Sequence, residues 1–411
     1  KRSIDTSVLE RQHTSDVPLG FSFWREQRVL ADDFPVYVSC TNEETHAVIR
    51  NNLSLTPNFN GLITSEGPRH CPSLEAKIVK FPQRASHKVF LEPEGRDSAE
   101  VYLQGIYTAF PPDIQDRIVH SIVGLEHAQI ERYGYDIQYD YIDPTQLSPT
   151  LELDGIRGLY LAGQVNGTTG YEEAAGQGLV AGVNAARSVV GGPPFVISRT
   201  EAFIGVMIDD LVTKGVTEPY RMLPSRAEYR ITLREGNADL RLSGIGHEIG
   251  LLDDRCYEQA MVRKSEIEKL LLHLKNERIG SNHPLNEALA RRRTPVLTDN
   301  GASLYELLRR PPVRLLDLIS DNDYPEDVLT EVEIEAKYSG YLEQQEREIE
   351  RLRRMERLLI PEDMDYAALE SISIEGRDLL SRVRPSTFGQ ASRIPGVARA
   401  DLSMLAIILR Q

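Results

Sequence analysis

Residues 158–187 constrain the fold of this chain more than any other stretch. Residues 159–162 are a short apolar run, a pattern typical of a strand that is buried on both faces. Residues 163–170 form a turn rich in Gly and Thr, and Thr169 with Glu172 makes the capping-box pattern that begins a helix. Small residues then recur on one face of the predicted helix, at Ala174, Gly178, Gly182 and Ala186.

The spacing of this strand–turn–helix unit is compatible with two interpretations. A face of small residues lets a sheet or a flat ligand approach the helix backbone, and the free N–H groups at a helix start attract polar and anionic ligand atoms. The unit is then a cofactor site. The alternative is an ordinary, tightly packed strand and helix without a ligand, because Gly-rich turns alone are weak signals.

A resemblance to a known family favours the cofactor site. The unbroken segment GLYLAGQVNGTTGYEEAAGQGLVAG resembles the flavin-contacting motif of the MnmG (GidA) family, flavoproteins that modify the wobble uridine of tRNA. Gln164 stands where other flavoproteins with two dinucleotide sites often have Asp, and an amide can serve the same neutral hydroxyls because it donates as well as accepts. The resemblance implies that FAD is held by Gly163, Gln164, Asn166, Gly167, Thr168, Thr169, Gly170, Glu172 and Glu173.

The motif that binds the pyrophosphate in such flavoproteins is not found in the chain. The sequence has no GxGxxG after a strand, and Gly244, Gly246 and Gly250 have a different spacing. If the resemblance holds, we expect the motif to lie in an amino-terminal part upstream of Lys1. The flavin-binding Rossmann domain of this chain is then incomplete.

A second block, residues 67–81, carries a candidate thiol. Pro72 suits the first position of a helix, and Cys71 suits the cap before it. The start of a helix and the neighbouring Arg69 and His70 would both lower the pKa of the Cys71 thiol. The alternative is an inert, buried Cys in a tight loop. The block resembles the family motif GPRYCPSxExKxxxF, with His70 in place of Tyr. The resemblance implies a nucleophile at Cys71 and nicotinamide contact by Gly67, Pro68, Arg69, His70, Cys71, Pro72, Ser73, Glu75, Lys77 and Phe81.

Local patterns and the resemblance together divide the chain into four regions. Residues 1–140 are predicted to be a sheet-rich, inserted nicotinamide-binding domain, with strands at 88–91, 100–103 and 134–142 and helices at 42–53 and 111–125. Residues 141–192 are the C-terminal return of the FAD-binding domain, which ends at a Gly/Pro cluster. A helical domain is expected at 193–341 and a C-terminal helical subdomain, for partner and tRNA docking, at 342–411. Apolar residues at helical spacing predict helices over 261–274 and 342–359.

Arginines provide the candidate RNA contacts. Arg226, Arg230 and Arg234 recur every four residues and would form one stripe on a helix, able to hold an RNA backbone. The alternative is a salt-bridged face with Glu228, Glu235 and Asp239 as partners. The segment resembles the family's EPYRMxxSRAEYRLxLRxDNADLRL, which lies close to where tRNA is thought to bind, and the block with Arg393 resembles GQASRIxGV, which is implied to dock the GTPase MnmE. The RNA-binding candidates are Arg221, Arg226, Arg230, Arg234, Arg241 and Arg393.

Composition excludes several other classes. The net charge of −15 argues against a generally basic nucleic-acid coat, so RNA binding requires a local patch. The basic run 291–293 is expected to be exposed. Three widely spaced cysteines favour reduced thiols in the cytoplasm over a disulfide framework or a zinc site, and no metal is expected. No apolar run approaches the roughly 18 residues of a membrane span.

The sequence therefore predicts a two-dinucleotide-site α/β flavoprotein domain, with an incomplete Rossmann domain, followed by an all-α C-terminal region. The resemblance implies addition of a (carboxymethyl)aminomethyl group to carbon 5 of the wobble uridine, with FAD, NAD(P)H and methylenetetrahydrofolate. It also implies a homodimer that joins an MnmE-type GTPase in a heterotetramer. Two alternatives remain: a folate-dependent tRNA uridine methyltransferase, which the helical tail from residue 198 argues against, and a tRNA- and GTPase-binding module without flavin.

Overall fold

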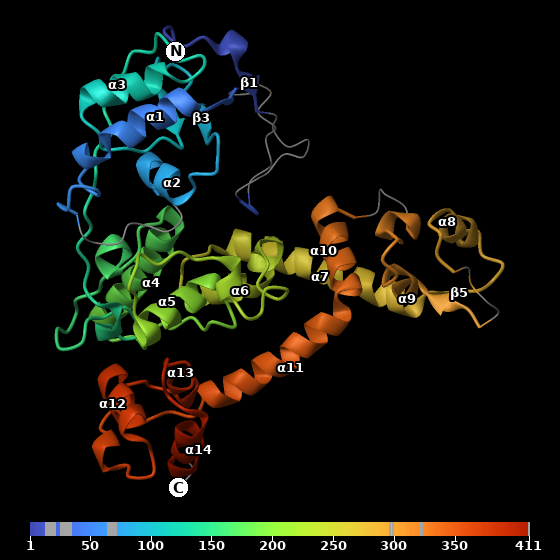
Figure 1. Ribbon diagram of the computed structural model, residues 1–411. Helices are drawn as coiled ribbons and strands as arrows, with labels where there is room; N and C mark the ends of the chain where they lie inside the picture. The colour runs from blue at the N-terminus through green and yellow to red at the C-terminus, as the bar shows by residue number, and fades with distance from the viewer. Residues whose placement is uncertain are drawn as a thin grey trace. The chain divides into compact units, whose positions relative to one another are not determined.

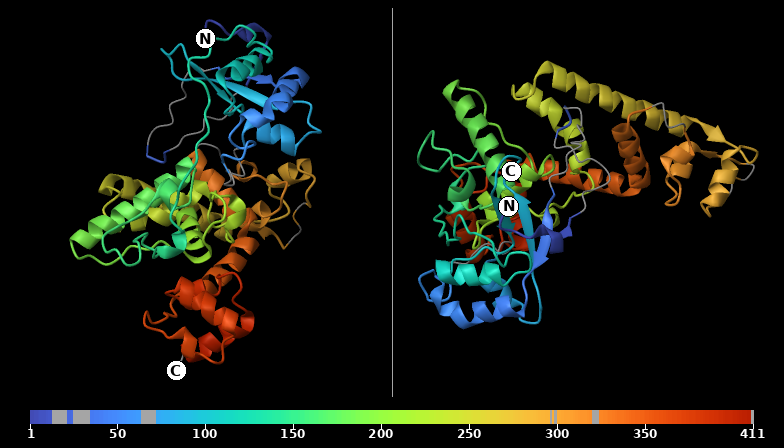
Figure 2. Two further views of the ribbon diagram at one scale, coloured as in Figure 1. Left: turned by 60° about the vertical axis from the view of Figure 1, so that its left-hand side comes forward. Right: turned by 90° about the horizontal axis from the view of Figure 1, so that it is seen from above.

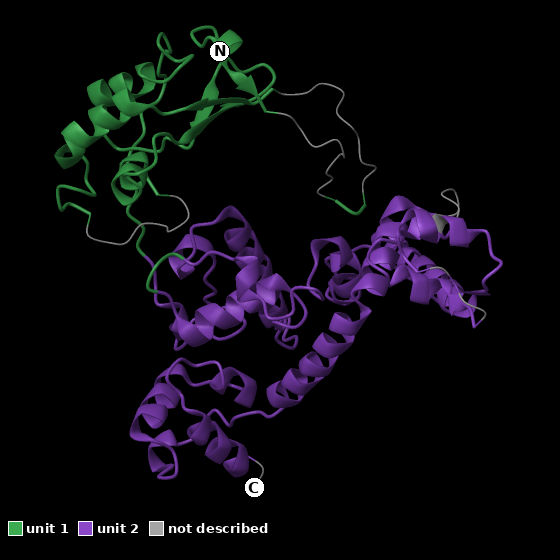
Figure 3. Ribbon diagram, turned by 45° about the vertical axis from the view of Figure 1, so that its right-hand side comes forward, with its two compact units in different colours: residues 1–140, 217–219 green, residues 141–216, 220–411 purple. Residues whose placement is uncertain are grey.

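The computed structural model describes residues 1–12, 22–24, 35–63, 72–295, 297, 300–319 and 324–409. The chain forms two compact units, which Figure 3 shows in different colours. Unit 1 comprises residues 1–140 with 217–219, and unit 2 comprises residues 141–216 with 220–411. Among the described residues, no helix is both long and apolar enough to cross a membrane.

Unit 1 is an antiparallel sheet with three helices. The strands follow one another in the order β1 (Glu10–Arg11), β2 (Tyr37–Cys40), β3 (Lys88–Pro93) and β4 (Val101–Gln104). The helices are α1 (Glu43–Asn52), α2 (Leu74–Lys80) and α3 (Pro112–His120), with short 3-10 turns at η1 (Thr6–Val8) and η2 (Leu53–Leu55) (Figure 1). A single apolar core joins sheet and helices, and includes Ile49, Leu74, Val89, Leu91, Ile118 and Leu125.

Several local predictions for unit 1 are confirmed. Asn42 caps α1 in a capping box with Thr45, and β3 and β4 lie where the apolar runs place them. The strand predicted at 134–142 is wrong, because these residues pair with no strand. The cap of α2 is also wrong: the Ser73 side chain accepts from the Ala76 N–H, so the helix begins at Leu74, and Cys71 lies outside the described residues.

Unit 2 is helical apart from one short two-stranded ribbon, β5 (Arg278–Ile279) with β6 (Ala302–Ser303). The helix α11 leads from α10 to the C-terminal helices α12–α14 (Figure 2). The helices are α4 (Tyr171–Val189), α5 (Phe203–Lys214), α6 (Ala238–Glu248), α7 (Asp254–Asn276), α8 (Leu285–Arg291), α9 (Leu304–Leu308), α10 (Glu326–Lys337), α11 (Ser339–Glu356), α12 (Ile374–Val383), α13 (Phe388–Ala391) and α14 (Arg399–Ile408). Single 3-10 turns lie at η3 (Pro144–Gln146), η4 (Gly163–Asn166), η5 (Pro224–Arg226), η6 (Glu235–Asn237), η7 (Leu315–Asp317) and η8 (Tyr366–Ala368).

Five apolar clusters stabilise the described part of unit 2, and the three with the most buried residues lie in different places. One lies around α4 and α5, one around α7, α9 and α10, and one among α12–α14. The predicted helix over 261–274 is confirmed as part of α7, and the one over 342–359 is confirmed as α11, except that α11 ends at Glu356. The strand predicted at 159–162 is wrong: Tyr160 makes one isolated bridge with Glu152, and Leu159 is 39% exposed. A buried strand of this kind belongs to a sheet, with hydrogen-bonded strands on both of its edges. Among the described residues, 159–162 belong to no sheet.

Candidate functional site

The turn that precedes α4 depends on two glycines with positive φ. Gly163 and Gly167 have φ of 78° and 77°, a region that side chains with a Cβ rarely adopt. A Cβ at Gly167 would also lie 2.9 Å from Cγ2 of Val216 and 3.2 Å from Cγ of Pro144. The backbone of the turn can therefore be this compact only because Gly stands at both positions.

Gln177, which lies one and a half turns into α4, holds the turn from inside. Its side chain is fully buried and its Oε1 accepts from the Gly163 N–H at 3.0 Å and from the Asn166 Nδ2 at 2.9 Å. Its Nε2 donates to the Thr168 hydroxyl at 2.9 Å. One amide thus fixes three residues of the turn. Gln177 was not among the predicted site residues, although it lies at helical spacing from Val180 and Asn184, which are buried on the same helix.

The start of α4 differs from the predicted capping box. The N-cap is Gly170 and no side chain caps the helix, so the prediction that Thr169 and Glu172 form a box is wrong. The carboxylate that turns inward is instead Glu173, whose Oε1 accepts from the Met222 N–H at 2.7 Å and lies 3.2 Å from Nε of Arg221. A Cβ at Gly170 would lie 1.6 Å from Oε2 of Glu173, so this packing requires Gly. The first N–H groups of α4 remain without a side-chain cap and are available to a ligand.

The predicted FAD residues divide into two classes by exposure. Asn166, Thr168 and Glu173 are at most 3% exposed and stabilise the turn. The residues that face outward are Gln164 and Glu172, with Thr169 half-buried. Oδ1 of Asn166 is a buried acceptor with no hydrogen-bond partner among the described residues. The turn therefore combines a rigid inner layer with polar groups at its surface.

The small-residue face of α4 is open. Ala174, Gly178, Gly182 and Ala186 are all exposed, and a Cβ built at Gly178 or Gly182 meets no heavy atom within 4 Å. Val189 on the same helix is 86% exposed. Within the described part of the chain, this face is free for the close approach that its composition permits.

The structure describes the predicted nicotinamide segment only in part, since Gly67, Pro68, Arg69, His70 and Cys71 lie outside the described residues. The first described residue of the segment, Pro72, is half-buried. Ser73 caps α2, and the Lys77 ammonium donates to the Gly105 carbonyl at 2.8 Å. Glu75 is fully buried and accepts from the Thr108 hydroxyl at 2.9 Å, and burial raises the pKa of its carboxyl. These three side chains hold the segment in place, whereas Phe81, 41% exposed, is open to a ligand.

The predicted arginine stripe is wrong because residues 221–241 do not form one helix. Arg226 ends η5, Arg234 precedes η6 and Arg241 lies within α6. Arg234 pairs with the buried Glu331, and Arg241 donates to backbone carbonyls of Glu201 and Arg234. Both guanidinium groups are thus engaged inside the protein, and RNA contacts at Arg234 and Arg241 stay predictions.

The other arginines of this segment lie at the surface beside the turn. The Tyr220 N–H donates to the Gly167 carbonyl at 2.9 Å, which joins the segment to the turn. Arg221 pairs with Glu173, and the guanidinium of Arg226 lies 4.3 Å from the centre of the Tyr220 ring. Arg226 and Arg230 are exposed. The structure therefore brings two of the six predicted RNA-binding arginines, Arg221 and Arg226, to the candidate flavin turn.

Arg393 is a structural residue and not a surface contact. Its Nε and Nη2 each donate to the Asp209 carboxylate at 2.6 Å, and its Nη1 lies 2.6 Å from Oε1 of Glu356. Its side chain is 13% exposed. These pairs engage the guanidinium inside the protein, and an RNA contact at Arg393 stays a prediction.

Free thiols and metal ligands give no further site among the described residues. Cys40 is exposed and Cys256 is half-buried, and neither forms a disulfide. No group of three or more acidic, His or Cys side chains is placed to hold a metal ion in the described ranges. The flavin turn with its arginines is thus the candidate site of unit 2.

Comparison with known proteins gives one consistent family. The family model described as "Glucose inhibited division protein A" matches residues 1–193. Models of the "tRNA modifying enzyme MnmG/GidA" match its C-terminal helical domain to residues 254–346 and its C-terminal helical bundle to residues 348–411. The three matches follow one another along the chain.

Curated relatives and solved structures agree with these matches. The tRNA uridine 5-carboxymethylaminomethyl modification enzymes MnmG of Syntrophotalea carbinolica and Geobacillus thermodenitrificans are 46% and 45% identical over all of this chain, which spans 66% of the length of each. The form II crystal structure of Aquifex aeolicus GidA is 40% identical, with a TM-score of 0.86 over 100% of this chain and 65% of that one. The form I crystal gives 42% identity and a TM-score of 0.85 over 99% of this chain and 66% of that one.

The likeness extends through the α/β unit and the helical region alike, as the full coverage requires. The fold is that of the GidA structures: an α/β part with an antiparallel sheet, followed by C-terminal helical domains. With three models of one family and relatives 45–46% identical along its whole length, the chain belongs to the MnmG/GidA family.

Proposed function

We propose that this chain acts in tRNA modification, adding a (carboxymethyl)aminomethyl group to carbon 5 of the wobble uridine. The observation that carries the proposal is the glycine turn fixed by Gln177, which leads into an uncapped helix start beside exposed arginines. The names of the curated relatives, tRNA uridine 5-carboxymethylaminomethyl modification enzymes, support the same chemistry.

FAD fits the features of this turn. The N–H groups that start α4 have no side-chain cap, the Asn166 Oδ1 is an unpartnered buried acceptor, and the small face of α4 lets a flat group or a sheet approach. Gln164 and Thr169 would hold the ribityl and ring side. Bound FAD would relay hydride from reduced nicotinamide and carry a one-carbon unit from methylenetetrahydrofolate, and glycine or ammonia would complete the added group.

Unit 1 would present the nicotinamide and the thiol. Buried Glu75 and Lys77, through Thr108 and Gly105, would keep the start of α2 in position for NAD(P)H, with Phe81 at its exposed end. Cys71 would add to the pyrimidine ring and so activate carbon 5, as expected for covalent catalysis.

The proposal extends to domains, partners and compartment. Residues 1–140 would present nicotinamide, 141–192 would complete the FAD-binding domain, 193–341 would form a helical domain, and 342–411 would dock tRNA and an MnmE-type GTPase. Two copies of the chain would form a homodimer and join the GTPase in a cytoplasmic heterotetramer. The matches of 254–346 and 348–411 to separate helical family models support a division within the helical region.

The test follows flavin binding and modification together. The chain is supplied with FAD, reduced nicotinamide, methylenetetrahydrofolate, glycine, the GTPase and tRNA, and wobble nucleosides are measured by mass spectrometry. We expect Cys71→Ser to reduce the modification below detection while the flavin absorbance stays unchanged, because only the nucleophile is removed. Cys256→Ser, at a half-buried free thiol, is the matched control and is expected to keep full activity.

Two outcomes contradict parts of this proposal. Activity retained in Cys71→Ser reduces that thiol to a structural role. If no flavin is bound, even when the remaining third of a relative's length is supplied in trans, the flavin-dependent reaction is rejected and the chain is a tRNA- and GTPase-binding module.

Arg226→Ala tests the RNA side of the site. We expect weaker tRNA binding and a slope of log Kd against log salt concentration that is smaller by about one, because one phosphate contact is lost. Binding is measured by fluorescence anisotropy over a salt series. Arg117→Ala, which removes an exposed charge from α3 in unit 1, is expected to leave the slope unchanged. An unaltered slope in Arg226→Ala would mean that this guanidinium only stacks on Tyr220.

A further inference from the structure

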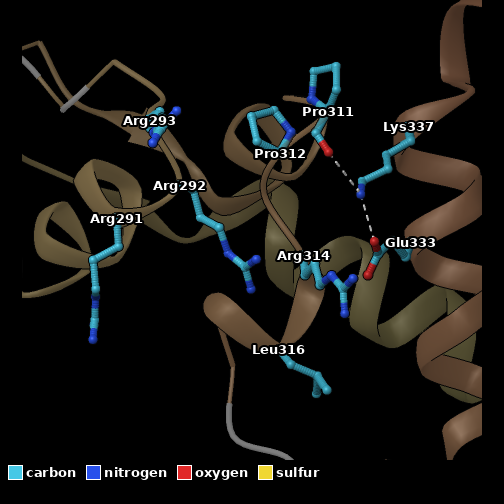
Figure 4. A pocket seen from close by; sticks show the side chains of 9 residues that line it. All are labelled: Arg291, Arg292, Arg293, Pro311, Pro312, Arg314, Leu316, Glu333 and Lys337. Carbon is cyan, nitrogen blue, oxygen red and sulfur yellow. Dashed lines mark hydrogen bonds and ion pairs between the residues drawn. The ribbon is translucent and has the colours of Figure 1, made fainter.

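A basic cleft lies in the helical region of unit 2, away from the residues of the flavin turn. Its volume is about 750 Å³, and it is lined by the end of α8, the loop between α9 and η7, and the last turns of α10 (Figure 4). Five of its nine lining residues are basic and one is acidic, Glu333. The basic residues are Arg291, Arg292, Arg293, Arg314 and Lys337.

Two of the five cations have carboxylate partners that orient them. The Asp317 carboxylate accepts from Nη2 of Arg292 at 2.9 Å and from Nε at 3.1 Å, which raises the pKa of Arg292. Glu333 Oε1 lies 2.6 Å from Nζ of Lys337, and its Oε2 accepts from the Leu315 N–H at 3.0 Å. The acidic groups at the cleft are therefore occupied by these two side chains and by backbone N–H groups.

The other three cations are not neutralised in the same way. Arg291, Arg293 and Arg314 are exposed, and within the described ranges none of them forms an ion pair with a carboxylate. Figure 4 shows Arg291 and Arg292 leaving the end of α8 in the same direction. The cleft thus carries an uncompensated positive charge in a chain whose net charge is −15.

The backbone at Arg293 supports a role for its side chain. Its φ is 52°, just past the C-terminus of α8, where Gly or Asn is the usual residue. An Arg in this left-handed conformation is less stable than a Gly would be. The helix end would be more stable with Gly, so packing does not account for an Arg at this position.

The chemistry of the lining favours phosphate groups. Guanidinium groups bind phosphate oxygens in a bidentate geometry, and several of them along an open cleft suit a polyanionic backbone. Pro311, Pro312 and Leu316 supply the apolar surface, and no aromatic side chain or Met lines the cleft. A protein partner is bound mainly through buried aromatic anchors, and a small ligand through a mostly apolar pocket, so both fit this lining less well.

We propose that this cleft binds the phosphate backbone of tRNA, at a contact separate from that of Arg221 and Arg226. The proposal rests on the tRNA-modifying function proposed above and adds to it a second anchoring point on the helical region. Arg292 and Lys337, held by their carboxylates, form the fixed wall of the cleft. Arg291, Arg293 and Arg314 would neutralise phosphates of the RNA. The counterions held by those phosphates would then be released.

The test uses the 411-residue chain and a triple variant, Arg291→Gln/Arg293→Asn/Arg314→Gln. Asn suits the positive φ at position 293, and none of the three side chains has a described ion pair to lose, so the fold is expected to be retained. Binding of fluorescent tRNA is measured by anisotropy over a salt series. We expect Kd to rise at least about tenfold at 100 mM salt and the salt slope to fall by about two to three, since three phosphate contacts are removed.

The matched control removes the same charge elsewhere. Arg2→Gln/Arg117→Gln/Arg132→Gln changes three exposed arginines of unit 1 and is expected to leave both Kd and the slope unchanged. Equal losses in the two triple variants would attribute the effect to net charge and overturn the cleft. Unchanged binding in the cleft variant overturns it as well, with the proposed function intact. If the unsubstituted chain does not bind tRNA, the proposed tRNA-modifying function is rejected, and the cleft proposal is rejected with it. Arg291→Glu and Arg314→Glu, made singly, repeat the test if the triple variant melts at a lower temperature.

Discussion

Arg393→Ala is expected to weaken the attachment of the C-terminal helices to α5 by about 3–5 kcal/mol. Arg393 contacts Asp209 on α5 through two hydrogen bonds of 2.6 Å, and Glu356 at the end of α11 through a third contact of 2.6 Å. The side chains are 13%, 11% and 24% exposed. Removal of the guanidinium leaves two carboxylates largely out of water without this partner, which costs more than the lost hydrogen bonds alone.

The same carboxylate also takes part in a wider network. Arg199, which is 3% exposed, pairs with Asp209, with Asp210 at 3.2 Å and with Glu228 at 2.7 Å. Burial alone would lower the pKa of Arg393, but Asp209 and Glu356 raise it overall. Arg393 therefore stays charged at every accessible pH, and its loss is not compensated by a proton.

Hydrogen exchange of residues 374–408 measures the effect, because a chain with two compact units does not unfold in a single step. We expect faster exchange at α13, together with protease cleavage near residue 360. Arg393→Lys keeps the charge but not the two-pronged geometry and is expected to lose about half as much. The matched control, Arg382→Ala on the exposed side of α12, is expected to change stability by less than about 0.5 kcal/mol. Equal exchange in Arg393→Ala and Arg382→Ala would contradict the prediction.

Apolar periodicity predicted the helices well. Ile114 and Ile118 of α3 are buried in one core, as the helix predicted over 111–125 required, but α3 ends at His120 and Ile122 joins the same core from the turn that follows. Ile267, Leu270 and Leu274 of α7 are likewise buried, as the helix predicted over 261–274 required. Burial of an apolar stripe stabilises a helix whatever its charged residues do, so this signal is carried by the sequence alone.

The regular spacing of charged residues, in contrast, did not predict a helix correctly. Arg226, Arg230 and Arg234 share helical spacing, but Pro224 begins a 3-10 turn and the segment then continues as turns. The buried side chains between them, Ala227, Tyr229 and Leu233, pack against Ile349 of α11, a distant partner. For Arg234, the alternative of a salt-bridged side chain agrees better with the structure than the RNA-binding stripe does. Its partner, Glu331, lies 97 residues away along the chain, so the sequence could not identify it.

The flavin turn was located from its glycines, but its internal support was not. Glu173 was predicted as an FAD contact and Gln177 was given no role, and both side chains are at most 3% exposed. Their partners, the Met222 N–H and the backbone at Gly163, are visible only once the chain has folded. The small residues pointed to a packed face, and within the described residues this face is open.

Gln177→Ala is expected to lower stability around the turn by about 3–5 kcal/mol. The change leaves the Gly163 N–H and the Asn166 amide buried without the acceptor that both use, and it opens a cavity next to Met207, whose sulfur lies 3.9 Å from Nε2 of Gln177. The turn then loses its fixed conformation. Since 1.4 kcal/mol is a factor of ten, FAD affinity is expected to fall at least about tenfold.

Two measurements separate structure from ligand binding. Hydrogen exchange of residues 163–170 reports the turn in the absence of any cofactor, and quenching of flavin fluorescence reports affinity. Gln344→Ala, at an exposed amide of α11 that bonds only to Glu348 at 3.0 Å, is the matched control and is expected to change neither. Unchanged protection of the turn in Gln177→Ala would contradict its role as the support.

Gln177→Glu sharpens the test because it keeps the shape of the side chain. Burial raises the pKa of the introduced carboxyl above its unfolded value of about 4.3, so the neutral form is the one that the fold accepts. In that form the oxygen can still accept from the Gly163 N–H and the O–H can donate to Thr168. The variant is therefore expected to match the wild type at low pH and to lose stability as pH rises through the folded pKa, while the wild-type turn does not change. A loss that is the same at pH 5 and pH 8 would mean that the site is too wet for one buried amide to govern the turn.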